Sequence, residues 1–224
     1  YIVSRLKLID GFFFFFIQML EYQMNFIQNS LNVKSGVIYT PIYKLLKDTK
    51  LTKINEEIIF LYTGSIYGVR TARYLLEAFE QLLNDFPDSK LQFVGKVLPM
   101  KEIEVFRLEV QHKIELIPFT DDLSPLINNA LALIDIDADI ENDVFLSSKI
   151  ISYLPYKKPI ISETSNGSPS YDLFNKVPSI IQCTHNSEEI YQAMKLVILN
   201  KDKIDFSDRD ILLQKFNINN IVKT

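Results

Sequence analysis

The stretch Ile58–Phe86, IIFLYTGSIYGVRTARYLLEAFEQLLNDF, has the pattern of a strand, a glycine turn and an amphipathic helix. Residues 58–62 are apolar and rich in β-branched and aromatic side chains, which predicts a strand buried on both faces. Within residues 74–86 the apolar side chains recur at i, i+1, i+4, i+5, i+8, i+9 and i+12, which predicts a helix with one buried face. Thr71 is the expected N-cap of this helix, and Pro87 is expected to end it.

The same change from strand pattern to helix pattern recurs along the chain. Helical patterns separate short apolar runs at 58–62, 91–94, 114–117, 131–136, 159–162 and 179–182. Such alternation predicts an α/β domain with a doubly wound, Rossmann-like parallel sheet that helices cover on both faces. Ligands of such sheets bind beyond the carboxyl ends of the strands, so the turns that follow the strands are the candidate sites.

A lysine-rich segment divides the chain. We interpret residues 46–56 as a linker inside the polar stretch KLLKDTKLTKINEE. Residues 1–45 before it carry the patterns of a strand, a helix and a strand, which are too few elements to fold alone. Residues 57–200 form the predicted α/β domain. Residues 201–224 are expected to end in a helix that places four apolar side chains on or near one face: Ile211, Leu212, Phe216 and Ile218.

The composition narrows the class of protein. The 224 residues carry a formal net charge of -4, with a pI near 5.3, and a nucleic-acid partner would favour a basic face. The chain has one cysteine, Cys183, which cannot form an internal disulfide, so we expect a reducing, cytoplasmic compartment. Cys183 closes an apolar strand and is expected in the core. The longest apolar run, Phe12–Ile17, is far shorter than the ~20 residues of a membrane-spanning helix.

The turn after the first strand of the domain is a candidate phosphate site. Gly64 and Gly68 allow the backbone to approach a ligand closely, and the start of the following helix attracts anions. Arg70 adds a guanidinium that can bind a phosphate through two hydrogen bonds. An ordinary loop with a surface arginine is the alternative, because the spacing matches neither the dinucleotide-binding pattern nor a P-loop.

A second helix start strengthens this interpretation. In DVFLSSKIISYLPYKKPII, residues 143–161, Ser147 and Ser148 are candidate N-caps and Lys149 lies in the first turn. A lysine is unfavourable beside the positive end of a helix dipole unless an anion lies between them. The two helix starts together therefore predict a doubly negative group held at the edge of the sheet. A solvated lysine that is merely tolerated there remains the alternative.

The acidic string DIDADIEND places Asp135, Asp137 and Asp139 on one face if it is extended. A carboxylate–metal clamp is therefore a rival hypothesis, although the string lacks the glycine and the glutamate that a calcium loop requires at its sixth and twelfth positions. We expect no metal. His112 and His185 lie in predicted polar segments and are expected to be exposed.

Three segments resemble the group 1 family of nucleotide-sugar glycosyltransferases, whose two Rossmann-like domains face each other in the GT-B arrangement. They are FLYTGSIYGVRTARYLLEAFEQL with KLQFVGK, IELIPFTDDLSPLINNALALIDI, and VFLSSKIISYLPYKKPIISETSNGSPS. The resemblance covers about residues 57–200 and implies the C-terminal, donor-binding domain. It also implies that residues 1–45 are the end of an acceptor domain that is otherwise missing.

The resemblance assigns roles to several residues. Gly64 matches the glycine beside the donor phosphates, and Arg70 falls where the family usually has a phosphate-binding lysine. Phe119 belongs to the loop that cradles the nucleobase, and Lys149 matches a lysine common in one branch of the family. The arginine that usually follows the glycine is Ser65 here.

The paired-glutamate motif of the family is also altered. Its two glutamates fall on Val144 and Ser152, and a serine can offer a ribose only a neutral hydrogen bond where the carboxylate offers two charge-assisted ones. Either Asp139, Glu141 or Asp143 takes over contacts to the sugar, or the chain is a weak or specialised binder. The expected donor-binding set is Gly64, Ser65, Arg70, Phe119, Ser147, Ser148, Lys149 and Ser152.

The resemblance implies a retaining, metal-independent glycosyltransferase that uses a nucleoside-diphosphate sugar as donor and needs no cofactor. The expected partner is the missing acceptor domain. We expect no nucleic-acid partner and no transmembrane segment. If the protein attaches to a membrane surface, we expect the missing domain to make that contact. Two alternatives stay open. One is a degenerate nucleotide-sugar-binding or interaction module, suggested by Ser65 and Ser152. The other is a GT-B-like nucleotide-sugar epimerase, which would need carboxylates and histidines at the cleft.

Overall fold

A computed structural model describes residues 57–140, 143 and 146–216 of the chain. The predicted segments 1–45 and 46–56 lie outside these residues, as do Glu141, Val144 and Ile218.

The core is a six-stranded sheet in which every neighbouring pair of strands is parallel. The strand order is β3-β2-β1-β4-β5-β6. The strands are β1 Ile59–Thr63, β2 Lys90–Gly95, β3 Ile114–Pro118, β4 Ala132–Ile136, β5 Ile160–Glu163 and β6 Ile180–Cys183. All six predicted strands and the doubly wound, Rossmann-like architecture are confirmed.

The order of the strands reverses at β1. The chain moves outward from β1 to β2 and β3, and then returns to place β4 on the other side of β1. Loops that leave β1 and β4 therefore diverge at this point, which is where doubly wound sheets bind their ligands. β1 and β4 are buried along their whole length, as expected for central strands covered on both faces.

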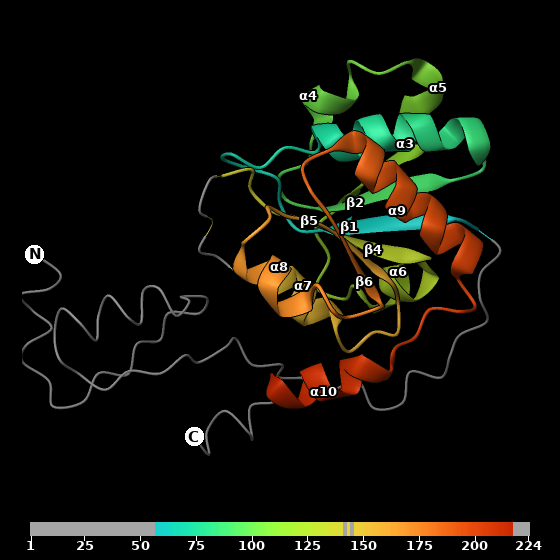
Figure 1. Ribbon diagram of the computed structural model, residues 1–224. Helices are drawn as coiled ribbons and strands as arrows, with labels where there is room; N and C mark the ends of the chain where they lie inside the picture. The colour runs from blue at the N-terminus through green and yellow to red at the C-terminus, as the bar shows by residue number, and fades with distance from the viewer. Residues whose placement is uncertain (1–56, 141–142, 144–145, 217–224) are drawn as a thin grey trace, which may run out of the picture.

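Helices cover both faces of the sheet (Figure 1). One face carries α3 (Arg73–Asp85) and α9 (Ser187–Asn200), with the short helices α4 (Met100–Ile103) and α5 (Leu108–Gln111) beyond them. The other face carries α6 (Ser124–Asn129), α7 (Ser148–Tyr153), α8 (Pro169–Phe174) and α10 (Ser207–Lys215). Among the described residues, no helix is long and apolar enough to cross a bilayer.

The predicted buried face of α3 is largely confirmed. Leu75, Ala78, Phe79 and Leu82 are fully buried against the sheet. The helix begins at Arg73 with Ala72 as its N-cap, so the expectation of Thr71 at the cap is wrong by one residue. The Thr71 hydroxyl still accepts a hydrogen bond from Arg73 N at 3.1 Å.

The terminal helix differs from its prediction. Leu212 and Phe216 pack into the core below the sheet, whereas Ile211 is 69% exposed. Arg209 is buried instead, and its guanidinium donates to the carbonyl oxygens of Tyr156 (2.6 Å) and Lys158 (2.6 Å). The helical period places Arg209 on the same buried face as Leu212 and Phe216. A hydrogen-bonded cation therefore occupies a buried position where hydrophobicity alone predicts an apolar residue.

Candidate functional site

A pocket of about 300 Å³ lies beyond the carboxyl ends of β1, β2 and β3. Its size is at the lower end of the ~300–1,000 Å³ usual for small-molecule sites. The lining residues come from four separate parts of the chain: Thr63, Gly64, Ser65, Val94, Gly95, Lys96, Phe119, Thr120, Leu123 and Lys149. Four of the predicted donor-binding residues, Gly64, Ser65, Phe119 and Lys149, therefore line one pocket.

Two glycines in contact shape the wall of this pocket. Gly64 has a φ of +122°, a conformation that L side chains rarely adopt, and its N–H donates to Val94 O at 2.7 Å. A Cβ built on Gly95 would lie 2.0 Å from Gly64 O, so only glycine fits there. The turn after β1 therefore lies directly against the end of β2.

Lys149 crosses the face of Gly64. A Cβ on Gly64 would lie 2.8 Å from Lys149 Cε, and the ammonium of Lys149 lies 5.3 Å from the centre of the Tyr62 ring. In the described part of the chain no carboxylate forms an ion pair with Lys149. Because Gly64 has no side chain, Lys149 can pass directly over it. The ammonium of Lys149 therefore places a positive charge at the pocket.

A buried polar network supports α7 beneath Lys149. Ser147 Oγ donates to Asp135 Oδ1 at 2.7 Å, and burial raises the pKa of Asp135 to about 6 while the nearby charge of Lys149 opposes the rise. From the other end of α7, Tyr153 Oη accepts a hydrogen bond from Thr63 N at 3.0 Å. Burial raises the pKa of Tyr153, so its phenol stays neutral. These contacts fix α7 against the ends of β1 and β4.

Lys96 and Phe119 form the other end of the pocket. The Lys96 ammonium lies 4.9 Å from the centre of the Phe119 ring, which is 56% exposed. Thr120 and Leu123 follow Phe119 in the loop after β3 and line the same space. An aromatic face, an apolar side chain and a hydroxyl are suited to a planar, polar-edged group such as a nucleobase.

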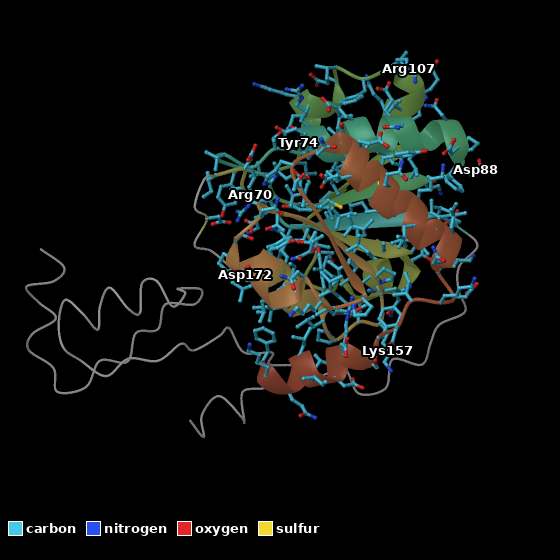
Figure 2. All side chains as sticks on the ribbon, in the orientation of Figure 1. Arg70, Tyr74, Asp88, Arg107, Lys157 and Asp172 are labelled. Carbon is cyan, nitrogen blue, oxygen red and sulfur yellow. The ribbon has the colours of Figure 1, made fainter. Side chains whose placement is uncertain are left out.

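Arg70 is not among the residues that line the pocket. It lies at the end of the domain opposite Asp88, which follows α3 (Figure 2), and its guanidinium pairs with the buried carboxylate of Asp137 at 3.3 Å. Burial lowers the pKa of Arg70, but the charge and hydrogen bond of Asp137 outweigh burial and raise it overall. Arg70 and Lys149 both lie close enough to Asp135 to affect its pKa, so they occupy the same edge of the sheet.

The N-terminus of α3 is satisfied by a protein carboxylate. Glu102, in α4, accepts hydrogen bonds from Thr71 Oγ1 and from Ala72 N, the latter at 2.9 Å. The expectation that the starts of two helices hold one ligand anion is therefore wrong for α3, because Glu102 already occupies that position. The sequence offered no sign of this contact, since the glutamate lies about 30 residues away.

The three serines of the predicted set are not equivalent. Ser147 is the N-cap residue of α7, but its side chain makes no capping hydrogen bond, because its hydroxyl donates to Asp135 instead. Ser148 is exposed at the first residue of α7. Ser152 is exposed as well, and its hydroxyl donates to Lys149 O at 2.8 Å. None of the three lines the pocket.

The prediction that His185 is exposed is wrong. Its side chain is only 7% exposed, and its Nδ1 lies 2.8 Å from Glu163 Oε1 at the ends of β5 and β6. Burial raises the pKa of Glu163 to about 7. Burial lowers the pKa of His185, but the bond to Glu163 outweighs burial and raises it overall. By contrast His112 is exposed and Cys183 is buried, as predicted.

The acidic string is split by the fold. Asp135 is buried on the side of α7, Asp137 pairs with Arg70, and Asp139 is exposed. In residues 57–140, 143 and 146–216 no group of three histidine, cysteine or acidic side chains is arranged to hold a metal ion.

Comparison with known proteins agrees with this fold. The sequence matches no protein-family model, and no curated protein matches it significantly. Solved structures do match: TarM from S. aureus has a TM-score of 0.68 at 16% identity, over 92% of this chain and 41% of TarM. HepE of Anabaena in complex with UDP-glucose has a TM-score of 0.63 at 13% identity, over 91% of this chain and 51% of HepE.

A third match covers one whole domain. The C-terminal domain of LpcC, a glycosyl transferase group 1 family protein from Francisella tularensis, aligns over its full length with 82% of this chain, at 14% identity and a TM-score of 0.57. TarM, HepE and LpcC are GT-B glycosyltransferases. The described domain therefore has the fold of a GT-B C-terminal domain, and the chain spans about half the length of HepE and less of TarM.

Proposed function

We propose that the chain is the donor-binding part of a glycosyltransferase and that its pocket binds a nucleoside-diphosphate sugar. The observation that carries the proposal is the placement of Lys149, an ammonium without a carboxylate partner among the described residues, across Gly64 in a pocket whose ten lining residues include no acid. Such a pocket selects an anion, although the chain as a whole is acidic. HepE, which shares the fold, was solved with UDP-glucose bound.

The parts of the ligand follow the order of the strands. The base would lie against Phe119 and Leu123 at the end of β3, and the diphosphate would lie at the turn after β1, where Lys149 and the backbone of Gly64 meet. When the bond from the sugar to the diphosphate breaks, negative charge grows on the leaving phosphate. A fixed ammonium next to that phosphate stabilises the transition state, in which this charge develops, more than it stabilises the ground state.

The finer features of the proposal come from the family resemblance. The proposed reaction is the transfer of a hexose with retention and without a metal, to an acceptor bound by a separate N-terminal domain. The proposed role is in polysaccharide or glycolipid synthesis. The proposed location is cytoplasmic, at the inner face of the membrane if that other domain attaches there. We expect this chain by itself to transfer no sugar, because the residues that would hold the acceptor belong to that other domain.

A nucleotide-sugar-binding module without transferase activity is the second candidate. It is favoured by two contacts that remove expected ligand groups: Asp137 already pairs with Arg70, and Glu102 already caps α3. The exposed Ser152, bonded to the helix backbone, also leaves the ribose without a carboxylate from α7. An epimerase is less well supported, because Glu163 and His185 are a buried pair and not an accessible acid and base.

Thermal unfolding with a panel of nucleoside diphosphates tests the binding. We expect UDP or GDP to raise the Tm of the 224-residue chain, since a ligand that binds only the native state stabilises it by mass action. Lys149→Met should reduce the shift strongly, whereas the exposed control Lys101→Met should not. No shift with any diphosphate would refute the proposal.

A transfer assay then separates the two candidates. Adding an N-terminal acceptor domain to the chain should allow transfer of a labelled sugar from the diphosphate that binds best. Tight binding without transfer or donor hydrolysis in that longer protein would favour the binding module.

A further inference from the structure

Lys96 is the second cation of the pocket, and the proposed roles above leave it without one. It directly follows Gly95 at the end of β2 and lines the same space as Lys149. The remaining lining residues are apolar side chains, hydroxyls and glycines. Among the residues that the structure describes, the pocket is therefore lined by two ammonium groups and no acidic group.

Contacts between two loops hold Lys96 in this place. Ser65 Oγ accepts a hydrogen bond from Val97 N at 3.2 Å, and Ile66 N donates to Val97 O at 2.9 Å. These bonds tie the turn after β1 to the loop after β2, immediately next to the contact of Gly64 with Gly95. Lys149 reaches Gly64 from α7, so the two lysines approach the same glycine pair from different elements.

No ion pair between described residues neutralises the charge of Lys96. Within the ranges that the structure describes, no carboxylate forms an ion pair with it, and its ammonium rests over Phe119 at 4.9 Å from the ring centre. A cation on an exposed aromatic face is held weakly and is free to turn toward an anion. Two ammonium groups in one pocket repel each other, and an anion between them converts this repulsion into attraction on both sides.

We propose that Lys96 is a phosphate-binding residue that works with Lys149 as a pair on the diphosphate of the ligand. This inference rests on the proposed nucleotide-sugar binding and deepens it, because it makes the number of phosphates the main determinant of affinity. When the base stacks on Phe119, the ammonium of Lys96 leaves the ring and turns to the phosphate. The pocket should then prefer a nucleoside diphosphate to a monophosphate, and a monophosphate to a nucleoside.

Calorimetric titration of the full chain tests the inference with matched ligands, uridine against UDP and guanosine against GDP. Lys96→Met keeps the length of the side chain and removes its charge. It should weaken the diphosphate about 10-fold or more, because a charge-assisted hydrogen bond is lost, and change the nucleoside less than about 2-fold. Lys96→Arg should retain most of the affinity. Lys101→Met, which removes an exposed charge outside the pocket, is the matched control.

Salt provides a second readout. Affinity of the wild-type chain for the diphosphate should fall as ionic strength rises, and the fall should be less steep in Lys96→Met, because one screened contact is missing.

Three outcomes would overturn the inference. An unchanged affinity of Lys96→Met for the diphosphate would exclude Lys96 alone and leave the proposed function intact. Equal losses for nucleoside and diphosphate would place Lys96 at the base instead of the phosphate. A wild-type chain that binds no nucleoside diphosphate would refute the proposed function and this inference together.

Discussion

Replacing Gly64 by alanine tests whether the glycine is required by its backbone, by Lys149 or by both. At a φ of +122° a side chain is strained, and a residue held in so sparsely populated a region costs about 1–3 kcal/mol. The new Cβ would also lie 2.8 Å from Lys149 Cε. The lysine can move away, at about 0.5–1.5 kcal/mol for a side chain forced off its rotamer.

The expected loss of unfolding free energy for Gly64→Ala is therefore about 2–4 kcal/mol. In a domain of this size it corresponds to a fall in Tm of roughly 5–15 °C. Urea unfolding at constant m-value measures the loss directly. Gly68→Ala is the matched control, because Gly68 also has a positive φ, +68°, but a Cβ there meets nothing within 4 Å. It should lose only the backbone part, about 1–2 kcal/mol.

A double-mutant cycle separates the two contributions. In a Lys149→Ala background the steric part disappears, so Gly64→Ala should cost about 0.5–1.5 kcal/mol less than in the wild type. Losses that add within about 0.3–0.5 kcal/mol would show that Lys149 does not pack on Gly64. The contact between Lys149 and Gly64, on which the description of the candidate site rests, would then be refuted.

Three further predictions concern the support around the pocket. Arg209→Met should lower the unfolding free energy by about 2–4 kcal/mol, because it leaves buried carbonyl oxygens without donors, whereas the exposed Arg107→Met should change it by less than about 0.5 kcal/mol; equal urea midpoints for the two variants would contradict the buried role of Arg209. Burial raises the pKa of Asp135 from 3.8 to about 6, so the native state binds this proton more tightly, and the stability that it provides is complete below pH 3.8 and lost as the pH rises to about 6. The unfolding free energy of the wild type should therefore fall by about 3 kcal/mol relative to that of Asp135→Asn over that window; a difference between the two that stays constant from pH 4 to 7 would refute this. Burial raises the pKa of Cys183 to about 12, so its thiol should react with a disulfide reagent only after unfolding, and rapid labelling of the native chain would count against a core position.

Much of the fold was predictable because its signals are local. Each strand is a short apolar run and α3 repeats its apolar residues at the helical period, so neither pattern depends on distant parts of the chain. The glycine turn could be recognised in the same way, since a positive φ at Gly64 and Gly68 is a property of the backbone at those positions. Gly64 and Lys149 were found because one follows a strand and the other begins a helix, whereas Ser65 and Phe119 were assigned by the family resemblance.

The residues that were missed or misplaced depend on contacts between distant segments. Lys96 also follows a strand, but it becomes a pocket residue only because β2 pairs with β1, and the sequence does not show that pairing. His185 appears polar and exposed in the sequence, yet the pairing of β5 with β6 buries it against Glu163. The position of Arg70 also depends on a distant contact, because the fold places its guanidinium next to the carboxylate of Asp137.

By itself the sequence determined which segments become strands and helices and where glycine must stand, because backbone preference and hydrophobic period act within a few residues of one another. Only the tertiary structure decided which charges face the pocket and which neutralise each other inside the protein. The partner of a charged side chain is set by the order and register of the strands, and these depend on packing between residues that the chain keeps far apart.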